Sequence, residues 1–410
     1  MNIGIICEYN PPHKGHAYQI AALKTQYPDC TVICVMSGNY VQRGTPAIAD
    51  KYLRAAAALS IGADAVLELP FPYSCAPAEL FARGGVGILS SLGVDALCFG
   101  TEGDVLPQLQ RAAEQLDSPA FRSAMAASAA DPKQRETGFP VMRDRVYAAL
   151  FGEADAALLR TPNNTLAVEY LRALSRVGRP ILPIAIPRTG DGHDAAYHTT
   201  PPPDAIVSAS TVRAMIANGE FDAAMQLLPK TTAQSLTEAY RAGHLCTEPD
   251  SIPGTVLLHT FACTPPSVLA QYAGLEGGLA GRLCAAASRA HTVEEFYALA
   301  ATKKYTHAAI RRAALYGCFG ITADMLRASP VYTTLLASTD RASSFLRRAK
   351  KESRLTVLSR PAAYKKAAED VQTSFLRALS ADVLWGLQLP SPRSMADMLA
   401  ASPTVIVHKP

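Results

Sequence analysis

Two histidines flank a glycine directly after the first apolar run of the chain. The run Ile3–Cys7 reads as a buried strand, and the segment Asn10-Pro11-Pro12-His13-Lys14-Gly15-His16 follows it, ahead of a helical pattern. A helix N-terminus offers backbone N–H groups and a partial positive charge, which favour phosphate. His13 and His16 can donate further hydrogen bonds to phosphate oxygens, and Gly15 lets the backbone approach a ligand closely. The alternative is a polar turn with two surface histidines, which the position between strand and helix disfavours.

A second polar cluster lies in residues 206–213. Ser208, Ser210 and Thr211 precede Arg213 at a predicted helix start. Hydroxyl groups and backbone amides at that point can cap the helix and bind phosphate. The guanidinium of Arg213 can neutralise charge that develops on a leaving pyrophosphate. An ordinary Ser/Thr cap is the alternative for this segment alone, but its pairing with the His-x-Gly-His segment favours phosphate binding.

Short apolar runs and amphipathic stretches alternate over the first 200 residues. The predicted strands are Ile3–Cys7, Thr31–Met36, Ala65–Leu69, Ala96–Phe99 and Ile181–Ile186. The predicted helices are Ala17–Tyr27, Lys51–Ile61 behind the cap residue Asp50, Pro77–Leu92, Leu106–Leu116 and Leu166–Val177. This alternation predicts an α/β fold with a mostly parallel sheet. Ligands of such sheets bind beyond the carboxyl ends of the strands, where the histidine segment is expected to lie.

After about residue 240 the strand patterns nearly vanish and Ala-rich helical patterns follow. Helices are predicted at Leu279–Arg289, Val293–Thr302, His307–Tyr316 and Ser343–Lys351, with a small β element near Leu355–Leu358. We therefore expect two domains, one over residues 1–235 and a mainly helical module over residues 236–410.

Charge is distributed unevenly along the chain. The protein has 39 Lys and Arg against 35 Asp and Glu, a formal net charge of +4. Between residues 301 and 366, fourteen Lys and Arg are opposed only by Asp324, Asp340 and Glu352, so this window carries +11 and the remainder −7. Such asymmetry points to an anionic partner, and Tyr305 within the window can stack on an unpaired base. A solvated helical face is the alternative.

Composition excludes several classes of protein. A hydrophobic share of 49% excludes a disordered chain. Nine cysteines without a CxxC pair fit neither a disulfide framework nor a zinc site, and Cys30 and Cys34 read as small core residues. The first residues lack the basic region of a signal peptide, and no apolar run is long enough for a membrane span. We expect a cytoplasmic protein with no dedicated metal site.

Six further segments accompany the two polar clusters: 4–11 (GIICEYNP), 36–44 (MSGNYVQRG), 62–70 (GADAVLELP), 99–102 (FGTE), 162–166 (PNNTL) and 186–188 (IPR). The whole set resembles the tRNA(Met) cytidine acetate ligase family of the nucleotidyltransferase superfamily. The match is extensive over the first 215 or so residues and thinner afterwards. There, Thr302-Lys303-Lys304-Tyr305-Thr306 and Ile310-Arg311-Arg312 also fit the family.

The resemblance implies a Rossmann-like, ATP-binding catalytic domain over residues 1–235 and a basic tRNA-binding module over residues 236–410. It also implies a two-step reaction. Acetate attacks the α-phosphate of ATP to give acetyl-adenylate and pyrophosphate, and the N4 amine of the wobble cytidine of elongator methionine tRNA then takes the acetyl group. ATP is thus expected as a substrate that can bring Mg²⁺, with tRNA and acetate as the other partners.

The expected site residues fall into four sets. Catalysis by alignment and charge neutralisation is assigned to His13, His16 and Arg213. ATP binding is assigned to Cys7, Glu8, Tyr9, Asn10, Pro11, Pro12, His13, Lys14, Gly15, His16, Ala17, Tyr18, Gln19, Ile20, Gly100, Asn163, Arg188, Ser208, Ser210 and Thr211. The loop residues assigned to acetate or the target cytidine are Asn39, Gln42 and Arg43. Contact with tRNA is assigned to Lys303, Lys304, Tyr305, Arg311, Arg312, Arg347, Arg348, Lys350 and Lys351.

The chain departs from the family pattern at two places. Pro12 stands where the family usually carries Phe, which should not affect the chemistry, and residues 330–345 are more polar than expected, which leaves another RNA or another acyl donor open. The alternative functions are a small-molecule adenylyltransferase or pantothenate-synthetase-like ligase, and a non-catalytic RNA-binding protein. The basic module disfavours the first alternative, and the intact His13, Gly15, His16 and Arg213 disfavour the second.

Overall fold

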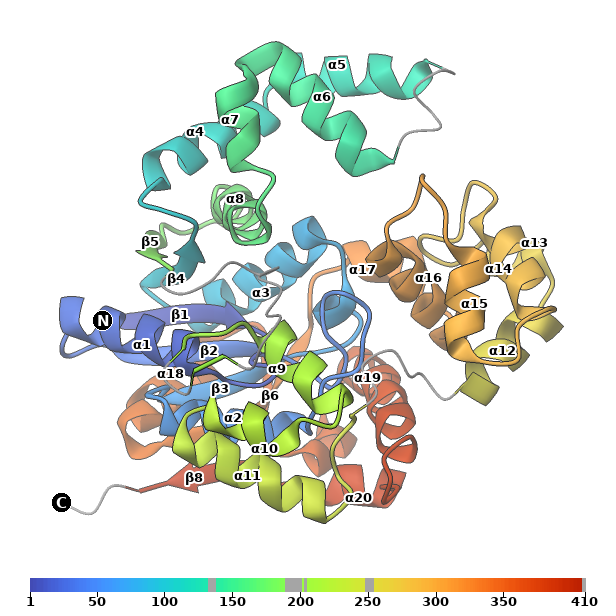
Figure 1. Ribbon diagram of the computed structural model, residues 1–410. Coiled ribbons are helices and arrows are strands. Elements are labelled where there is room, and N and C mark those ends of the chain that lie inside the picture. Colours follow the sequence, from blue (N-terminus) through green and yellow to red (C-terminus); the bar gives the residue numbers. More distant parts are fainter. Residues whose placement is uncertain (132–137, 189–200, 203–204, 248–253, 408–410) are drawn as a thin grey trace.

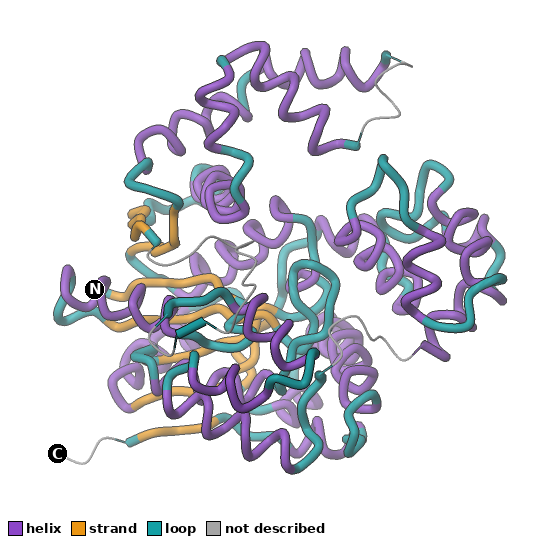
Figure 2. The backbone as a smooth tube through the Cα atoms, in the orientation of Figure 1, coloured by secondary structure: helices purple, strands orange, loops and turns teal. Residues whose placement is uncertain are grey.

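The computed structural model describes residues 1–131, 138–188, 201–202, 205–247 and 254–407. An eight-stranded sheet forms its centre (Figures 1 and 2). Its strands are β1 (Asn2–Cys7), β2 (Thr31–Ser37), β3 (Ala65–Leu69), β4 (Ala96–Thr101), β5 (Leu182–Pro187), β6 (Tyr332–Thr339), β7 (Thr356–Leu358) and β8 (Thr404–Ile406). They lie in the order β5–β4–β1–β2–β3–β6–β7, and β8 also pairs with β6.

Strands β1 to β5 are all parallel, because helical crossovers return the chain to the same edge after each strand. Strand β6 pairs with β3 in the antiparallel direction, with Ala65 opposite Ser338. The prediction of an α/β fold with a mostly parallel sheet is therefore confirmed. The five predicted strands match β1 to β5 to within two residues at each end.

The predicted helices of the first 200 residues are also present. They are α1 (Lys14–Gln26), α2 (Lys51–Ser60), α3 (Ala78–Leu92), α4 (Leu106–Leu116) and α8 (Pro162–Leu174). Asp50 caps α2 as expected, since its Oδ1 accepts a hydrogen bond of 2.7 Å from the backbone N–H of Tyr52.

Three further helices between α4 and α8 have no counterpart in the prediction. They are α5 (Pro119–Ala130), α6 (Phe139–Phe151) and α7 (Glu153–Leu158), and with α4 they form a lobe at the top of Figure 1. Phe121 is the buried hydrophobic residue of α5 and Tyr147 that of α6. These helices thus lack the wide apolar stripe from which a helix is recognised in sequence.

Helices α9 (Ala209–Ala217), α10 (Phe221–Gln226) and α11 (Lys230–Arg241) pack beside α2 through a separate apolar cluster. A second lobe, on the right of Figure 1, then follows. It consists of α12 (Gly254–Cys263), α13 (Pro266–Leu269), α14 (Leu279–Ala287), α15 (Val293–Ala300) and α16 (His307–Phe319). The two lobes approach each other at Gly138, where an added Cβ would lie 2.5 Å from the carbonyl oxygen of Lys304.

After α17 (Ala323–Arg327) the chain returns to the sheet through β6, α18 (Ser343–Glu352), β7, α19 (Glu369–Leu387), α20 (Met395–Ala400) and β8. The four helices and the small β element predicted after residue 240 are present as α14, α15, α16, α18 and β7. The stretch 236–410 nevertheless adds three strands to the sheet formed by residues 1–235. The polar residues of 330–345 serve this pairing, because the Thr333 hydroxyl donates 2.6 Å to the carbonyl oxygen of Glu68.

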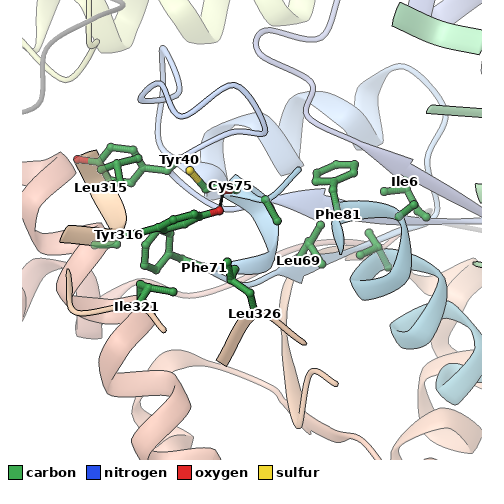
Figure 3. Close-up of a cluster of buried hydrophobic side chains, with 14 of the residues drawn as sticks. Ile6, Tyr40, Leu69, Phe71, Cys75, Phe81, Leu315, Tyr316, Ile321 and Leu326 are labelled. Carbon is green, nitrogen blue, oxygen red and sulfur yellow. Dashed lines mark hydrogen bonds between the residues drawn. The ribbon is translucent and has the colours of Figure 1, made fainter. Parts of the chain in front are cut away.

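The hydrophobic core continues from the sheet into α16. Figure 3 shows Phe71, Cys75 and Phe81 of the sheet region beside Leu315 and Tyr316 of α16. The Tyr316 hydroxyl donates 2.5 Å to the carbonyl oxygen of Cys75. The rings of Phe71 and Phe319 meet edge to face with centroids 5.2 Å apart. Helix α16 is therefore fixed to the sheet by packing as well as by hydrogen bonding.

Candidate active site

An open cleft lies at the carboxyl ends of β1, β4 and β5. It encloses about 1350 Å³ free of protein atoms, open solvent included. Of the residues predicted for the site, those that line it are Cys7, Glu8, Tyr9, Asn10, His13, Gly15, His16, Tyr18, Gln19, Gln42, Arg43, Gly100, Asn163, Arg188, Ser210 and Arg213. Segments as far apart in the chain as Cys7 and Arg213 therefore meet in one place, at the edge of the sheet expected for an α/β fold.

The two histidines cap helix α1. The backbone N–H of Gly15 donates 3.0 Å to Nδ1 of His13, and the backbone N–H of His13 donates 3.2 Å to Nδ1 of His16. Their rings stack with centroids 3.7 Å apart. A Cβ on Gly15 would lie 2.9 Å from Cε1 of His13, so a side chain at this position would displace the ring.

These hydrogen bonds determine the tautomer of both rings. A nitrogen that accepts from a backbone N–H carries no proton, so in each neutral imidazole the proton is on Nε2. Both histidines line the cleft and can therefore act there as Nε2–H donors. Next to them, Tyr9 has a φ of +43° and its ring centroid lies 4.7 Å from that of His16.

Arg213 reaches the same segment from helix α9. Its Nη1 donates 2.5 Å to the carbonyl oxygen of Asn10, and its Nη2 lies 3.4 Å from the Ser210 hydroxyl. Burial lowers the pKa of Arg213, while the charge of Glu8 opposes this shift. Ser208 is the N-cap, and its Oγ accepts 3.1 Å from the Thr211 N–H. Ser208 and Thr211 do not line the cleft. Their hydrogen bond is that of an ordinary helix cap, which was the alternative for this segment.

Gly100, Asn163 and Arg188 form a second wall of the cleft. Nη1 of Arg188 donates 2.9 Å to Oδ1 of Asn163, and the amide of Asn163 donates to Glu102. Glu102 also lies 3.8 Å from Nε of Arg188. A Cβ on Gly100 would approach Cγ of Arg188 to 3.4 Å. These residues thus present a polar surface over the ends of β4 and β5.

The loop of residues 38–44 is divided between two environments. Gln42 and Arg43 line the cleft, and the backbone N–H of Gln42 donates 3.0 Å to Oε1 of Glu8. Asn39 is buried and lies outside the cleft lining. Its amide donates 2.9 Å to Asp382, and its Oδ1 accepts 2.8 Å from the backbone N–H of Lys51. The geometry gives Asn39 a structural role in place of the predicted contact with acetate or cytidine.

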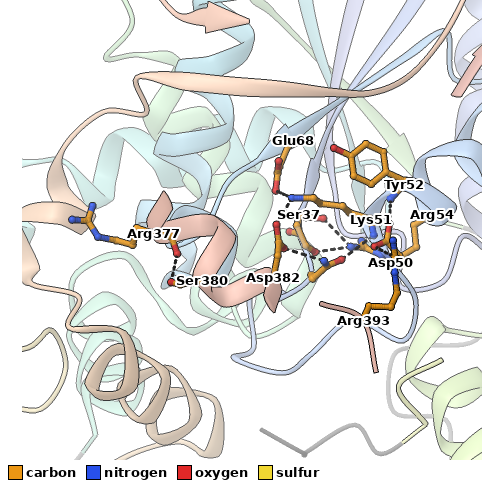
Figure 4. Close-up of polar contacts among 12 residues, drawn as sticks. Ser37, Asp50, Lys51, Tyr52, Arg54, Glu68, Arg377, Ser380, Asp382 and Arg393 are labelled. Atoms are coloured by element: carbon orange, nitrogen blue, oxygen red, sulfur yellow. Dashed lines mark hydrogen bonds and ion pairs between the residues drawn. The ribbon is translucent and has the colours of Figure 1, made fainter. Parts of the chain in front are cut away.

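Through these two bonds Asn39 joins a buried polar network, of which Figure 4 shows Lys51, Glu68 and Asp382. Nζ of Lys51 lies 2.6 Å from both Glu68 Oε1 and Asp382 Oδ2. Burial opposes the charge of Lys51, but the two carboxylates raise its pKa well above the ordinary value. Arg54 donates to the carbonyl oxygens of Ala49, Glu8, Ser37 and Gly38, and burial lowers its pKa to about 10. The network fixes the loop that borders the cleft.

Sequence reasoning missed the apolar wall of the cleft. This wall includes Phe81 of α3, Phe99 of β4, and Leu166 and Tyr170 of α8. The rings of Phe99 and Tyr170 lie with centroids 5.9 Å apart. In a sequence such residues are indistinguishable from ordinary core residues. Five predicted residues of the first segment also fall outside the lining, namely Pro11, Pro12, Lys14, Ala17 and Ile20.

The predicted tRNA-binding residues occupy two separate places. Lys303, Lys304, Tyr305, Arg311 and Arg312 lie on or just before α16, and Arg347, Arg348, Lys350 and Lys351 lie on α18, on the other side of the view in Figure 1. The lysines of both sets and the α18 arginines are exposed. Arg312 instead turns toward the cleft, where Nη1 donates 3.0 Å to the carbonyl oxygen of Gln42.

In the part of the chain that the structure describes, no group of three or more His, Cys, Asp or Glu residues is arranged to hold a metal ion. None of the helices there is long and apolar enough to cross a membrane.

Comparisons with known proteins agree with this geometry. A model of the HIGH Nucleotidyl Transferase family matches residues 1–394. The chain is 36% identical over 364 residues to a tRNA(Met) cytidine acetate ligase of Syntrophotalea carbinolica, covering 87% of this chain and 84% of the relative. It is 31% identical to the ligase of that name from Lysinibacillus sphaericus, over 92% of this chain and 94% of the relative.

Two solved structures of Thermotoga maritima TmcAL have the same fold. The apo form has a TM-score of 0.90 at 24% identity, over 99% of this chain and all of the other. The form bound with alpha-thio ATP has a TM-score of 0.87 at 25% identity, with the same coverage. The cleft geometry, the family model and these relatives together show that the chain belongs to the tRNA(Met) cytidine acetate ligase family of HIGH nucleotidyl transferases.

Proposed function

We propose that the protein uses ATP to activate acetate and then transfers the acetyl group to N4 of the wobble cytidine of elongator methionine tRNA. The observation that carries this proposal is the convergence of His13, His16, the α1 N-terminus and Arg213 in one cleft. The relative that binds alpha-thio ATP supports ATP as the nucleotide, and the names of the relatives support the RNA substrate.

In the first step, an acetate oxygen forms a bond to the α-phosphorus of ATP. The bond from that phosphorus to the bridging oxygen of the β-phosphate breaks, and pyrophosphate leaves with the electron pair. Acetate is already ionised, so this step requires alignment and charge neutralisation rather than a base. Nε2–H of His13 and His16 would donate to the phosphate oxygens, and Arg213 would neutralise the leaving group.

In the second step, the N4 amine of the cytidine attacks the carbonyl carbon of acetyl-adenylate. AMP leaves with the electron pair of the carbon–oxygen bond, and the amine loses a proton to solvent. Gln42 and Arg43 line the cleft, and Gln42 is bonded by Arg312 of the helix that follows the exposed lysines, which supports a role for this loop in receiving the nucleobase. We therefore assign them to the acyl group or the base.

The remaining cleft residues are assigned to the nucleotide. Gly100 leaves room under Arg188, and Asn163 and Arg188 present amide and guanidinium donors over the ends of β4 and β5. We assign this wall to the adenosine moiety and the α1 N-terminus to the triphosphate.

For the RNA, we propose the exposed lysines before α16 as the principal contact. Lys303 and Lys304 directly precede α16, the helix whose Arg312 bonds the cleft loop. Tyr305 lies beside Lys304, and its ring would stack on a base. The exposed cations of α18 would make supplementary phosphate contacts.

The test is direct. The protein is incubated with ATP, labelled acetate and total tRNA, and the label is located by nucleoside analysis. We expect N4-acetylcytidine in elongator methionine tRNA, together with exchange of labelled pyrophosphate into ATP that depends on acetate. The absence of acetate-dependent exchange would refute the first step, and exchange without labelled tRNA would refute the second.

A further inference from the structure

Helix α16 touches the loop of the cleft at Gly44. The backbone of Gly44 has a φ of +79°, and a Cβ there would lie 2.7 Å from the backbone nitrogen of Arg312. It would also lie 3.0 Å from the carbonyl carbon of Arg311. The close approach brings the guanidinium of Arg312 within reach of the loop's backbone.

A continuous path of hydrogen bonds leads from Arg312 into the cleft. Nη1 of Arg312 donates 3.0 Å to the carbonyl oxygen of Gln42, whose own N–H donates 3.0 Å to Oε1 of Glu8. Glu8 lines the cleft, and its carbonyl oxygen accepts 2.6 Å from Nη1 of Arg54. The side chain of Glu8 is thus oriented by the backbone N–H of Gln42, a residue whose carbonyl group Arg312 in turn holds.

The helix that carries Arg312 is itself firmly placed. One turn further along, the hydroxyl of Tyr316 donates to the carbonyl oxygen of Cys75 (Figure 3). Phe319 packs on Phe71. Arg311 lies over the ring of Tyr297, with its guanidinium carbon 5.6 Å from the centroid. The guanidinium of Arg312 therefore bonds the loop from a rigid support.

We propose that Arg312 is a positioning residue for the nucleotide cleft, acting through Gln42 on Glu8, and not a contact for RNA phosphate. The inference rests on the proposed function, since it assigns a basic residue of the predicted RNA surface to the activation of acetate. A half-buried guanidinium that already bonds a carbonyl oxygen has less of its donor fork available to a phosphate. Its loss would loosen residues 41–44 beside the nucleotide.

The experiment compares Arg312→Met with Arg289→Met, a matched change at an exposed residue of the turn that follows α14 in the same lobe. Kinetics of acetate-dependent pyrophosphate exchange are measured without tRNA, and tRNA affinity is measured separately at fixed salt. We expect Arg312→Met to lower kcat/KM for ATP by about 10- to 100-fold, as for loss of a hydrogen bond from a charged group. The change in tRNA affinity should stay below about twofold, and Arg289→Met should match the wild type.

Two further variants separate positioning from a general loss of structure. Arg312→Lys keeps the charge and one donor, so it should recover part of the exchange rate. Gly44→Ala should impair exchange from the other side of the contact, because the added Cβ pushes the loop and α16 apart while both arginine side chains are retained. If Arg312→Met weakens tRNA binding and leaves exchange intact, the residue contacts RNA and the proposal is overturned. Equal kinetics of Arg312→Met and Arg289→Met would overturn it as well.

Failure of the proposed function would be recognised independently. In that case the wild type itself shows no acetate-dependent exchange, and ATP binding measured by calorimetry replaces the kinetic readout. Weaker ATP binding by Arg312→Met than by Arg289→Met would still support the positioning role. Equal affinities of the two variants for ATP would refute it.

Discussion

Lys51 and Asp382, which are 331 positions apart in the sequence, lie 2.6 Å apart (Nζ to Oδ2) in the interior of the protein. The pair joins helix α2 to helix α19, and Glu68 of β3 completes it. It therefore ties the C-terminal region of the chain to the loop that borders the cleft.

We predict that Asp382→Ala destabilises the protein by about 3 kcal/mol, because removal of one partner from a buried pair leaves uncompensated charge and an unpaired amide on Asn39. Chemical denaturation measures the loss. Asp324→Ala is the matched control, since this aspartate is exposed and its ion pair is with Arg327 on its own short helix. If the two variants were equally stable, the Lys51–Asp382 pair would not contribute to stability as predicted.

Asp117, at the end of α4, predicts a pH dependence. Partial burial raises the pKa of Asp117, but hydrogen bonds from Arg172 and the charges of Arg172 and Arg176 outweigh it, so that the pKa lies below its ordinary value. A lowered pKa means that the carboxylate stabilises the native state above about pH 4, and that this contribution is lost as pH falls through the native pKa. Asp117→Asn should therefore be less stable than the wild type at pH 7. The difference should shrink below about pH 4 in denaturation curves measured at several pH values.

His16 has a capping role and a proposed catalytic role, and two variants distinguish them. His16→Ala removes both, whereas His16→Asn keeps an oxygen that can accept from the backbone N–H of His13. We expect both variants to lower acetate-dependent pyrophosphate exchange by at least about 100-fold. Only the alanine variant should lose stability. Wild-type exchange in either variant would remove His16 from the proposed mechanism.

Gly15→Ala tests the placement of the His13 ring. The added Cβ would lie 2.9 Å from Cε1 of His13 and 3.3 Å from Cγ2 of Ile206, so the ring has to move. We expect kcat/KM for acetate-dependent pyrophosphate exchange to fall by about 10- to 100-fold, because small displacements of a positioned group slow catalysis by factors of this size. Gly87→Ala in α3 is the control, because a Cβ there has nothing within 4 Å.

The two parts of the basic surface should contribute unequally to RNA binding. We expect Lys303→Glu with Lys304→Glu to weaken tRNA binding and to reduce the slope of affinity against salt by about 2, as for two lost phosphate contacts. Lys350→Glu with Lys351→Glu on α18 should have a smaller effect. A filter-binding titration over a range of salt concentrations measures both, and the reverse ranking would move the RNA to α18.

Part of the site could be predicted because its residues follow a strand end. His13 and His16 come directly after β1, where an α/β sheet binds its ligands, and the pattern of apolar runs is sufficient to place them there. Arg213 lies in α9 and follows no strand, so only the pairing of its segment with the histidine segment indicated its role. The direction in which a side chain points is harder to predict than the place of its residue in the fold. Arg312 and Arg311 are neighbours in a basic run, yet Arg312 bonds the cleft loop and Arg311 covers a tyrosine ring. Asn39 was similarly misplaced, because its partner Asp382 is 343 positions away.

The fold was predictable where burial leaves a continuous apolar run. Strand β6 was missed because buried threonines such as Thr333 interrupt its apolar pattern. The hydroxyl of Thr333 donates to a carbonyl oxygen of β3, and this partner can be identified only when the neighbouring strand is known. Helices α5 and α6 were missed because each buries little of its own surface.

The pairing of β3 with β6 also has a consequence for synthesis of the chain. Strand β6 follows β3 by about 260 residues, so the ribosome completes β3 roughly 13 to 50 s before its partner at about 5–20 residues per second. During that interval the outer edge of β3, with its apolar Val66 and Leu67, has no native neighbour. Protection of this edge in the nascent chain, and in any fragment that stops near residue 235, is thus a requirement for obtaining soluble protein.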